Sequence, residues 1–142
     1  MTETDVAELL SRIDLFAGLS RRQLRKLAAD AREVRHGAGH VVTIEGRPGL
    51  GFHLILEGQV AVTQANSVRR TLGPGDYFGE ISMIDGQGRS ATVTTMAPMR
   101  AVAVSHAAFD RLLDDDPGFA RGLLLVLCNR LREAEQRAAA TG

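Results

Sequence analysis

The segment FHLILEGQVAVT, residues 52–63, contains two short runs that are typical of β-strands, with Gly58 between them. Apolar, β-branched and aromatic residues dominate both runs, and glycine marks the point where the chain turns. Similar short runs, separated by glycine-rich turns, occupy residues 41–44, 91–95 and 101–104. Many short strands at close spacing are typical of a sandwich or small barrel. The sequence therefore predicts a jelly-roll β-barrel over residues 37–104.

Helical patterns flank this β-rich region on both sides. Leu9, Leu10 and Ile13 recur at helical spacing and predict a short amphipathic helix. Ser20 and Gln23 have the spacing of a capping box, which predicts that a second helix runs from about residue 21 to residue 33.

Two more helices are expected after the barrel. The first ends before Asp116-Pro117, because a residue that precedes proline is disfavoured in the helical region. The second runs from about Pro117 to Ala139. We expect a mainly β fold with flanking helices, in one domain over residues 1–142. Its expected parts are N-terminal helices (about 1–36), a β-barrel (37–104) and C-terminal helices (105–139).

The composition excludes several classes of protein. Of 142 residues, 44% are hydrophobic and 24% charged, as in ordinary globular domains. Seventeen basic residues balance seventeen acidic ones, so a general affinity for nucleic acid or anionic membranes is not expected. The single cysteine, Cys128, excludes disulfides within the chain. No apolar run approaches the roughly 20 residues of a membrane span, and the acidic N-terminus does not resemble a signal peptide. We expect a cytoplasmic protein.

The stretch GPGDYFGEISMIDGQGRSA, residues 73–91, carries the chemistry. Gly79 precedes a few residues of expected helix, Ile81 to Ile84, whose first amides would be free to bind an anion. Arg89 could pair through its guanidinium with two oxygens of a phosphate. Glu80, a carboxylate beside such an anion site, would accept hydrogen bonds from ligand hydroxyls, as an acidic residue does with a ribose. A phosphate together with a ribose indicates a nucleotide.

The order Phe78-Gly79-Glu80-Ile81-Ser82, followed by Arg89-Ser90-Ala91-Thr92, resembles the phosphate-binding cassette of cyclic nucleotide-binding domains. This is the family of the bacterial catabolite activator protein and the regulatory subunits of protein kinase A. The glycine-punctuated segments 38–46 and 52–60 also resemble it, so the likeness covers nearly the whole chain. One departure is Ile81-Ser82, where the family more often has Leu-Ala or Leu-Gly.

The resemblance implies a role for each matched residue. Arg89 and the amides of Ile81 and Ser82 would hold the cyclic phosphate, Ser90 would add a hydroxyl contact, and Glu80 would bind the ribose 2′-hydroxyl. The full set of ligand-binding residues that it implies is Val62, Phe78, Gly79, Glu80, Ile81, Ser82, Arg89, Ser90, Ala91, Ala134 and Glu135.

Recognition of the base is assigned by resemblance to the long C-terminal helix. The matching positions are Ala134 and Glu135, where the hydroxyl found in the activator proteins is absent. Glu135 could accept from the amino group of adenine or from two N–H groups of guanine. Ser90, in place of a threonine, favours cAMP over cGMP.

The apolar pattern of the C-terminal helix also indicates a protein partner. Leu124, Leu127, Leu131, Ala134 and Ala138 are spaced by three and four residues, as in a coiled-coil seam. This seam could pack on its own barrel or on the same helix of a second subunit, and we favour a homodimer. We expect a sensor that signals by moving this helix to a protein effector that the sequence does not identify. We expect no specific binding of duplex DNA by these residues alone.

Two other functions are weighed. The first is an interaction module of the same family without a ligand, in which Glu80 and Arg89 would form only an ion pair. The second is a cupin-like metal enzyme, suggested by His36, His40, His53 and His106. Cupin sites need a closely spaced His-x-His with a nearby Glu and another His, which His40 and Glu45 alone do not supply. We therefore expect a binding protein rather than an enzyme, with no metal or cofactor.

Overall fold

The computed structural model describes residues 1–43, 46, 51–65, 67–88 and 91–141. Contacts divide the chain into two compact units. The β unit comprises Asp30–Asp110. The helical unit comprises Met1–Ala29 together with the chain from Arg111 onward.

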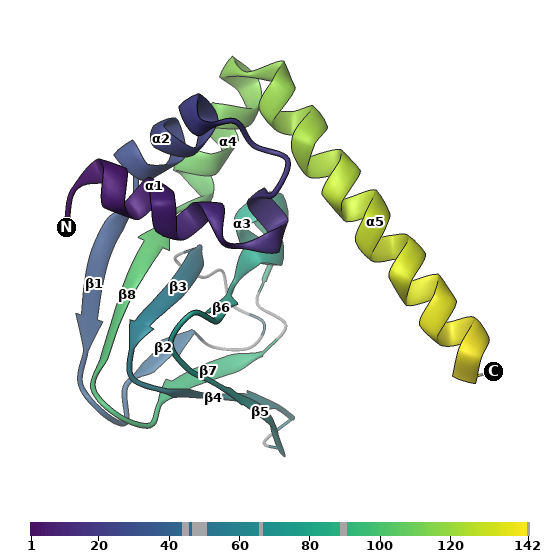
Figure 1. Ribbon diagram of the computed structural model, residues 1–142. Coiled ribbons are helices and arrows are strands. Elements are labelled where there is room, and N and C mark those ends of the chain that lie inside the picture. The colour runs from purple at the N-terminus through teal and green to yellow at the C-terminus, as the bar shows by residue number, and fades with distance from the viewer. Residues whose placement is uncertain (44–45, 47–50, 66, 89–90, 142) are drawn as a thin grey trace. The chain divides into compact units, whose positions relative to one another are not determined.

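The β unit contains two antiparallel sheets of four strands each (Figure 1). One has the order β1-β8-β3-β6 and the other β2-β7-β4-β5, which is the strand order of a jelly roll. The strands are β1 (Arg32–His36), β2 (Val41–Thr43), β3 (Phe52–Glu57), β4 (Val60–Gln64), β5 (Ser67–Leu72), β6 (Tyr77–Phe78), β7 (Thr92–Thr95) and β8 (Met99–Val104). The predicted jelly-roll fold is confirmed.

The core of the β unit lies between its two sheets. Ile55 and Ala101 reach it from one sheet, and Val60 and Val93 from the other. All four side chains are almost fully buried. Burial of such residues, at roughly 25 cal/mol per Å² of apolar surface, is the main force that holds the two sheets together.

The prediction of a helix up to residue 33 is wrong at its C-terminal end. Helix α2 (Arg21–Ala29) stops earlier, and β1 follows in the region that was assigned to N-terminal helices. Val34 is half-buried against the core, while Glu33 and Arg35 are exposed, which is the alternation of a strand. Pairing of β1 with β8 decides the conformation, because Val34 lies opposite Ala101.

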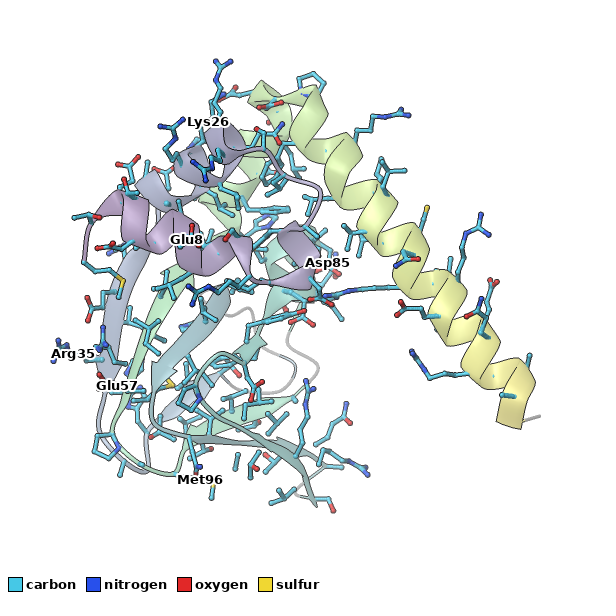
Figure 2. All side chains as sticks on the ribbon, viewed as in Figure 1. Glu8, Lys26, Arg35, Glu57, Asp85 and Met96 are labelled. Carbon is cyan, nitrogen blue, oxygen red and sulfur yellow. The ribbon has the colours of Figure 1, made fainter. Side chains whose placement is uncertain are left out.

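Charged side chains on the sheet face away from the core form an exposed cluster. Arg100 Nη1 donates to Glu33 Oε1 at 3.2 Å, and Arg100 Nη2 donates to Glu57 Oε1 at 2.9 Å. The hydrogen bond from Arg100, and then its charge, lower the pKa of Glu57. Arg35 and Glu57 are labelled on this part of the β unit in Figure 2. Exposed pairs contribute little to stability, so this cluster is an ordinary solvated surface.

The helical unit contains α1 (Glu3–Ser11), the short 3₁₀ helix η1 (Asp14–Phe16), α2 and the long α5 (Pro117–Thr141). The predicted capping box of α2 is confirmed, since the Ser20 amide donates to Gln23 Oε1 at 2.9 Å and the Gln23 amide donates to Ser20 Oγ at 3.2 Å. Helix α4 (His106–Asp115) links the two units along the chain. Its end before Pro117 is also as predicted.

Asp116 fixes the start of α5. Its Oδ1 accepts from the Phe119 amide at 3.2 Å and from Gln23 Nε2 at 3.3 Å, and Lys26 Nζ lies 3.7 Å from Oδ2. Burial alone would raise the pKa of Asp116, but these hydrogen bonds and the charge of Lys26 outweigh it and lower the pKa. An ionised aspartate is therefore the natural cap of α5.

Candidate functional site

A cavity in the β unit lies between α3 (Glu80–Asp85) and residues of the sheet β2-β7-β4-β5. It is lined by Thr43, Val62, Arg70, Phe78, Gly79, Glu80, Ile81, Ser82, Ala91 and Val93. Seven of these ten residues belong to the ligand-binding set expected from the sequence. Residues far apart in the chain thus meet around one cavity, although their contacts with a ligand remain predictions.

The backbone at Gly79 starts α3 in an unusual way. Gly79 has φ = 85°, a left-handed conformation that glycine adopts without the steric cost borne by other residues. As the N-cap it offers no side-chain acceptor. The first amides of α3 have no intrahelical carbonyl to bind, as at any helix start. The helix expected from residue 81 to residue 84 is confirmed.

Glu80 is the most informative side chain of the cavity. It is half-buried at the first position of α3 and lines the cavity. Within the described part of the chain, no hydrogen bond or ion pair holds its carboxylate. A carboxylate that is partly removed from water needs hydrogen-bond donors. Donors on a ligand would meet this need.

Buried residues and one hydrogen bond fix the remaining part of α3 to the β unit. Ser82 and Met83 are buried, and His106 Nδ1 donates to the Met83 carbonyl at 2.7 Å. In contrast, 62% of Ile81 is exposed at the edge of the cavity. The helix is thus anchored on one side and leaves its other side open to a ligand.

The strands beside the cavity are also fixed by particular contacts. The ring of Phe78 stacks on His53, with centroids 4.9 Å apart and an angle of 3° between the rings. Thr43 Oγ1 donates to the Ala91 carbonyl at 3.3 Å. This bond holds the chain just before β7, directly after the positions of Arg89 and Ser90 in the sequence.

Four predicted site residues are not placed at the cavity. Arg89 and Ser90, the expected phosphate contacts, lie outside the described residues. Ala134 and Glu135 are exposed residues of α5 and belong to the helical unit. Their roles stay predictions.

Three residues of the cavity were not expected from the sequence: Thr43, Arg70 and Val93. Thr43 and Val93 lie on strands that the sequence did predict, and they are paired with each other in the register of β2 and β7. Knowledge of that register would have placed both residues together beside the cavity. Arg70 lies on β5, a strand that was not predicted from the sequence. Five of its six residues are exposed, and its few apolar residues form no run that would indicate a strand.

The part of the chain that the structure describes contains no group of three or more His, Cys, Asp or Glu side chains suited to hold a metal ion. Nor does any of the described helices have both the length and the apolar character required to cross a bilayer.

Comparison with known proteins now adds independent evidence. The cyclic nucleotide-binding domain family matches residues 33–116, more than half of the chain. This chain belongs to the cyclic nucleotide-binding domain family. The resemblance noted from the sequence is thereby confirmed, and the family is regulatory rather than a class of enzymes.

Individual members of the family give the same result. A CRP-like cAMP-activated global transcriptional regulator of Mycobacterium tuberculosis is 31% identical over 137 residues, which cover 93% of this chain and 61% of the regulator. The chain thus spans about three-fifths of the length of that relative.

Solved structures of the family have the same fold. The N-terminal domain of a transcriptional regulator from Streptomyces coelicolor A3(2) has a TM-score of 0.81 and 29% identity, with 90% of this chain and 95% of that one covered. The regulatory domain of Toxoplasma gondii PKA, solved with cAMP, has a TM-score of 0.75 and 20% identity, over 92% of this chain and 50% of that one. The second likeness concerns the fold alone.

Proposed function

We propose that this chain binds a cyclic nucleotide, with cAMP as its ligand, and works as a sensor without catalysing a reaction. The observation that carries the proposal is Glu80, a half-buried carboxylate that faces the cavity and has no partner among the described residues. A ribose 2′-hydroxyl is a donor that such a carboxylate accepts. Membership of the cyclic nucleotide-binding domain family supports a cyclic nucleotide as the ligand that carries this ribose.

The phosphate end of the site is assigned from the sequence. Arg89 would pair with the cyclic phosphate through its guanidinium, and the Ile81 and Ser82 amides would donate to the same group. Ser90 would contribute a hydroxyl. Gly79 supports this role of the Ile81 and Ser82 amides. It precedes α3 as an N-cap without a side chain, so no capping side chain competes with the phosphate for these amides.

The choice of cAMP rests on two observations. The Mycobacterium tuberculosis relative is named as cAMP-activated and is 31% identical to this chain. The residue that follows Arg89 is Ser90 rather than threonine. Ala134 and Glu135 of α5 are the residues proposed to meet the base.

The signal is proposed to pass through α5. Leu124 and Leu131 are each 61% exposed, and both belong to the seam expected from the sequence. Exposed leucines along one helix favour burial against a partner. We propose that a second copy of the chain covers the seam, and that ligand binding shifts the packing of α5 toward a protein effector.

The Arg89→Ala variant tests the assignment. Loss of a charge-assisted contact with a desolvated phosphate raises Kd about 30-fold to several thousandfold, with no loss of folding. The matched control is Arg22→Ala, which removes an exposed arginine of α2 in the other unit. Calorimetric titration with cAMP gives both affinities. A folded Arg89→Ala variant with the affinity of the wild type would contradict the assignment, and a wild type that binds no nucleotide would favour the ligand-free module.

A further inference from the structure

Two stacked imidazole rings lie on the turn between β1 and β2. His36 is the last residue of β1, and His40 directly precedes β2. The centroids of their rings are 4.4 Å apart, with an angle of 8° between the ring planes. His36 lies opposite Met99, a core residue of β8, so its side chain starts from the inner face of the sheet. The pair therefore joins a half-buried ring at the edge of the core to an exposed one.

Protonation of this pair is unfavourable for two reasons. The Nε2 atom of His36 is buried and has no hydrogen-bond partner among the described residues. A neutral imidazole can leave one nitrogen without a proton, whereas an imidazolium has two N–H donors, so a charged His36 would bury a donor that lacks an acceptor. In addition, two charged rings with centroids 4.4 Å apart repel each other. The stack is thus least stable when both rings are protonated.

The charged residues of the surrounding strands do not offset these costs. Strands β1 and β8 contain four of them besides His36, and three form the exposed cluster on the other face of the sheet: Glu33, Arg35 and Arg100. The fourth, Arg32, is four residues from His36 along β1, or about 13 Å away. Strands β2 and β7 contain no charged residue. Accordingly, burial and then the charge of His40 lower the pKa of His36.

Hydrogen bonds to Thr95 of β7 hold the turn that carries the two rings. Thr95 Oγ1 donates to the Gly37 carbonyl at 2.6 Å and accepts from the His40 amide at 2.8 Å. The Thr95 amide donates to the His40 carbonyl, and the Gly39 amide donates to the Thr95 carbonyl, each at 2.8 Å. Since His40 contributes both a ring and two of these bonds, separation of the rings would disturb the contacts that place the start of β2.

Strand β2 connects this turn to the cavity. It is a short outer strand that pairs with β7 in an irregular register, and its last residue, Thr43, lines the cavity. We propose that the His36–His40 pair is an acid-sensitive latch. The turn stays closed while at most one ring is protonated and opens when both are, which loosens β2 and weakens ligand binding. The effect on stability is independent of the proposed function, whereas the effect on binding rests on it.

Thermal unfolding of the wild type, His36→Phe and His40→Phe at about pH 7.5 and about pH 5 tests the latch. Phenylalanine keeps a ring that can stack but cannot be protonated, and His40 is exposed, so the second variant guards against misfolding of the first. Folding lowers the pKa of His36, so the stabilisation is complete above the unfolded pKa near 6.5 and is lost as the pH falls below it. We expect the melting temperature of the wild type to fall between the two pH values by at least about 3 °C more than that of either variant. Equal falls in all three proteins would overturn the proposal.

Calorimetric titration of cAMP at the same two pH values tests the link to the cavity. We expect acidification to raise the Kd of the wild type about 3- to 10-fold more than that of either variant. A constant loss of affinity in a variant cancels, because each protein is compared with itself. A difference in melting temperature without a difference in Kd would refute the link between the latch and the cavity. A wild type that binds no cAMP at about pH 7.5 would instead refute the proposed function, while the melting temperatures would still decide whether the latch exists.

Discussion

Replacement of Glu80 by glutamine isolates the contact on which the proposed function depends. The substitution keeps the shape of the side chain but removes its charge. Because no described residue pairs with Glu80, we expect the melting temperature to stay close to that of the wild type. Binding should change instead, since the carboxylate is proposed to accept from the ribose 2′-hydroxyl.

The size of the effect follows from the type of bond. A hydrogen bond to a charged group is worth roughly 1.5 to 3 kcal/mol, and a glutamine oxygen still accepts a weaker neutral bond. A net loss of about 1 to 2 kcal/mol remains, which raises the Kd for cAMP by about 5- to 30-fold.

Calorimetric titration of cAMP and 2′-deoxy-cAMP into the wild type and Glu80→Gln makes a double-mutant cycle, which gives the interaction free energy between Glu80 and the 2′-hydroxyl. The deoxy ligand lacks the hydroxyl, so Glu80→Gln should hardly change its affinity. The matched control is Asp85→Asn, which neutralises an exposed carboxylate at the other end of α3 that does not line the cavity; Asp85 is labelled in Figure 2. Equal losses for cAMP and 2′-deoxy-cAMP would refute the reasoning, because Glu80 would then not hold the ribose.

Three further predictions concern stability and assembly. Gly51→Ala should lower the free energy of unfolding by at least about 2 kcal/mol in chemical denaturation, because φ is +114° there and the new Cβ would lie 2.1 Å from the Val104 carbonyl oxygen; Gly75→Ala, with φ = +89° and nothing within 4 Å, should cost clearly less, and equal losses would contradict the steric argument. Asp116→Asn should lower the melting temperature by roughly 3 to 8 °C at pH 7. Folding lowers the pKa of Asp116, so the ionised side chain stabilises the protein above the unfolded pKa near 3.9, and this stabilisation disappears as the pH falls through the lower folded pKa. A difference in melting temperature between variant and wild type that persists undiminished at pH 2 would contradict the capping role. Leu131→Asp should dissociate the proposed homodimer in sedimentation, because an unpaired carboxylate would be buried in the seam, and should also weaken cAMP binding if α5 links the seam to the site. A monomeric variant with unaltered affinity would show that seam and site are uncoupled.

Features that depend on neighbouring residues in the chain were predictable from the sequence. The capping box of α2 is made by Ser20 and Gln23, three positions apart, and both of its bonds form. The start of α3 at Gly79 is likewise a local matter of backbone freedom. The contiguous residues Phe78 to Ser82 could therefore be assigned to one site.

Features that depend on pairing between distant strands were not predictable in the same way. β1 contains one apolar residue that reaches the core, Val34, and only its partner strand β8 makes it a strand. β5 offers even less local signal, although its register against β4 is what brings Arg70 to the cavity. The position of Arg70 at the cavity therefore follows only from the three-dimensional structure of the β4-β5 hairpin.

Nucleotide binding is best tested by a calorimetric titration of the wild-type chain with cAMP and, separately, with cGMP. We expect saturable binding at one site per chain, and loss of the cAMP signal when cGMP already occupies that site. A folded protein that shows no binding of either nucleotide up to about 1 mM, a binding free energy of roughly 4 kcal/mol, would contradict it.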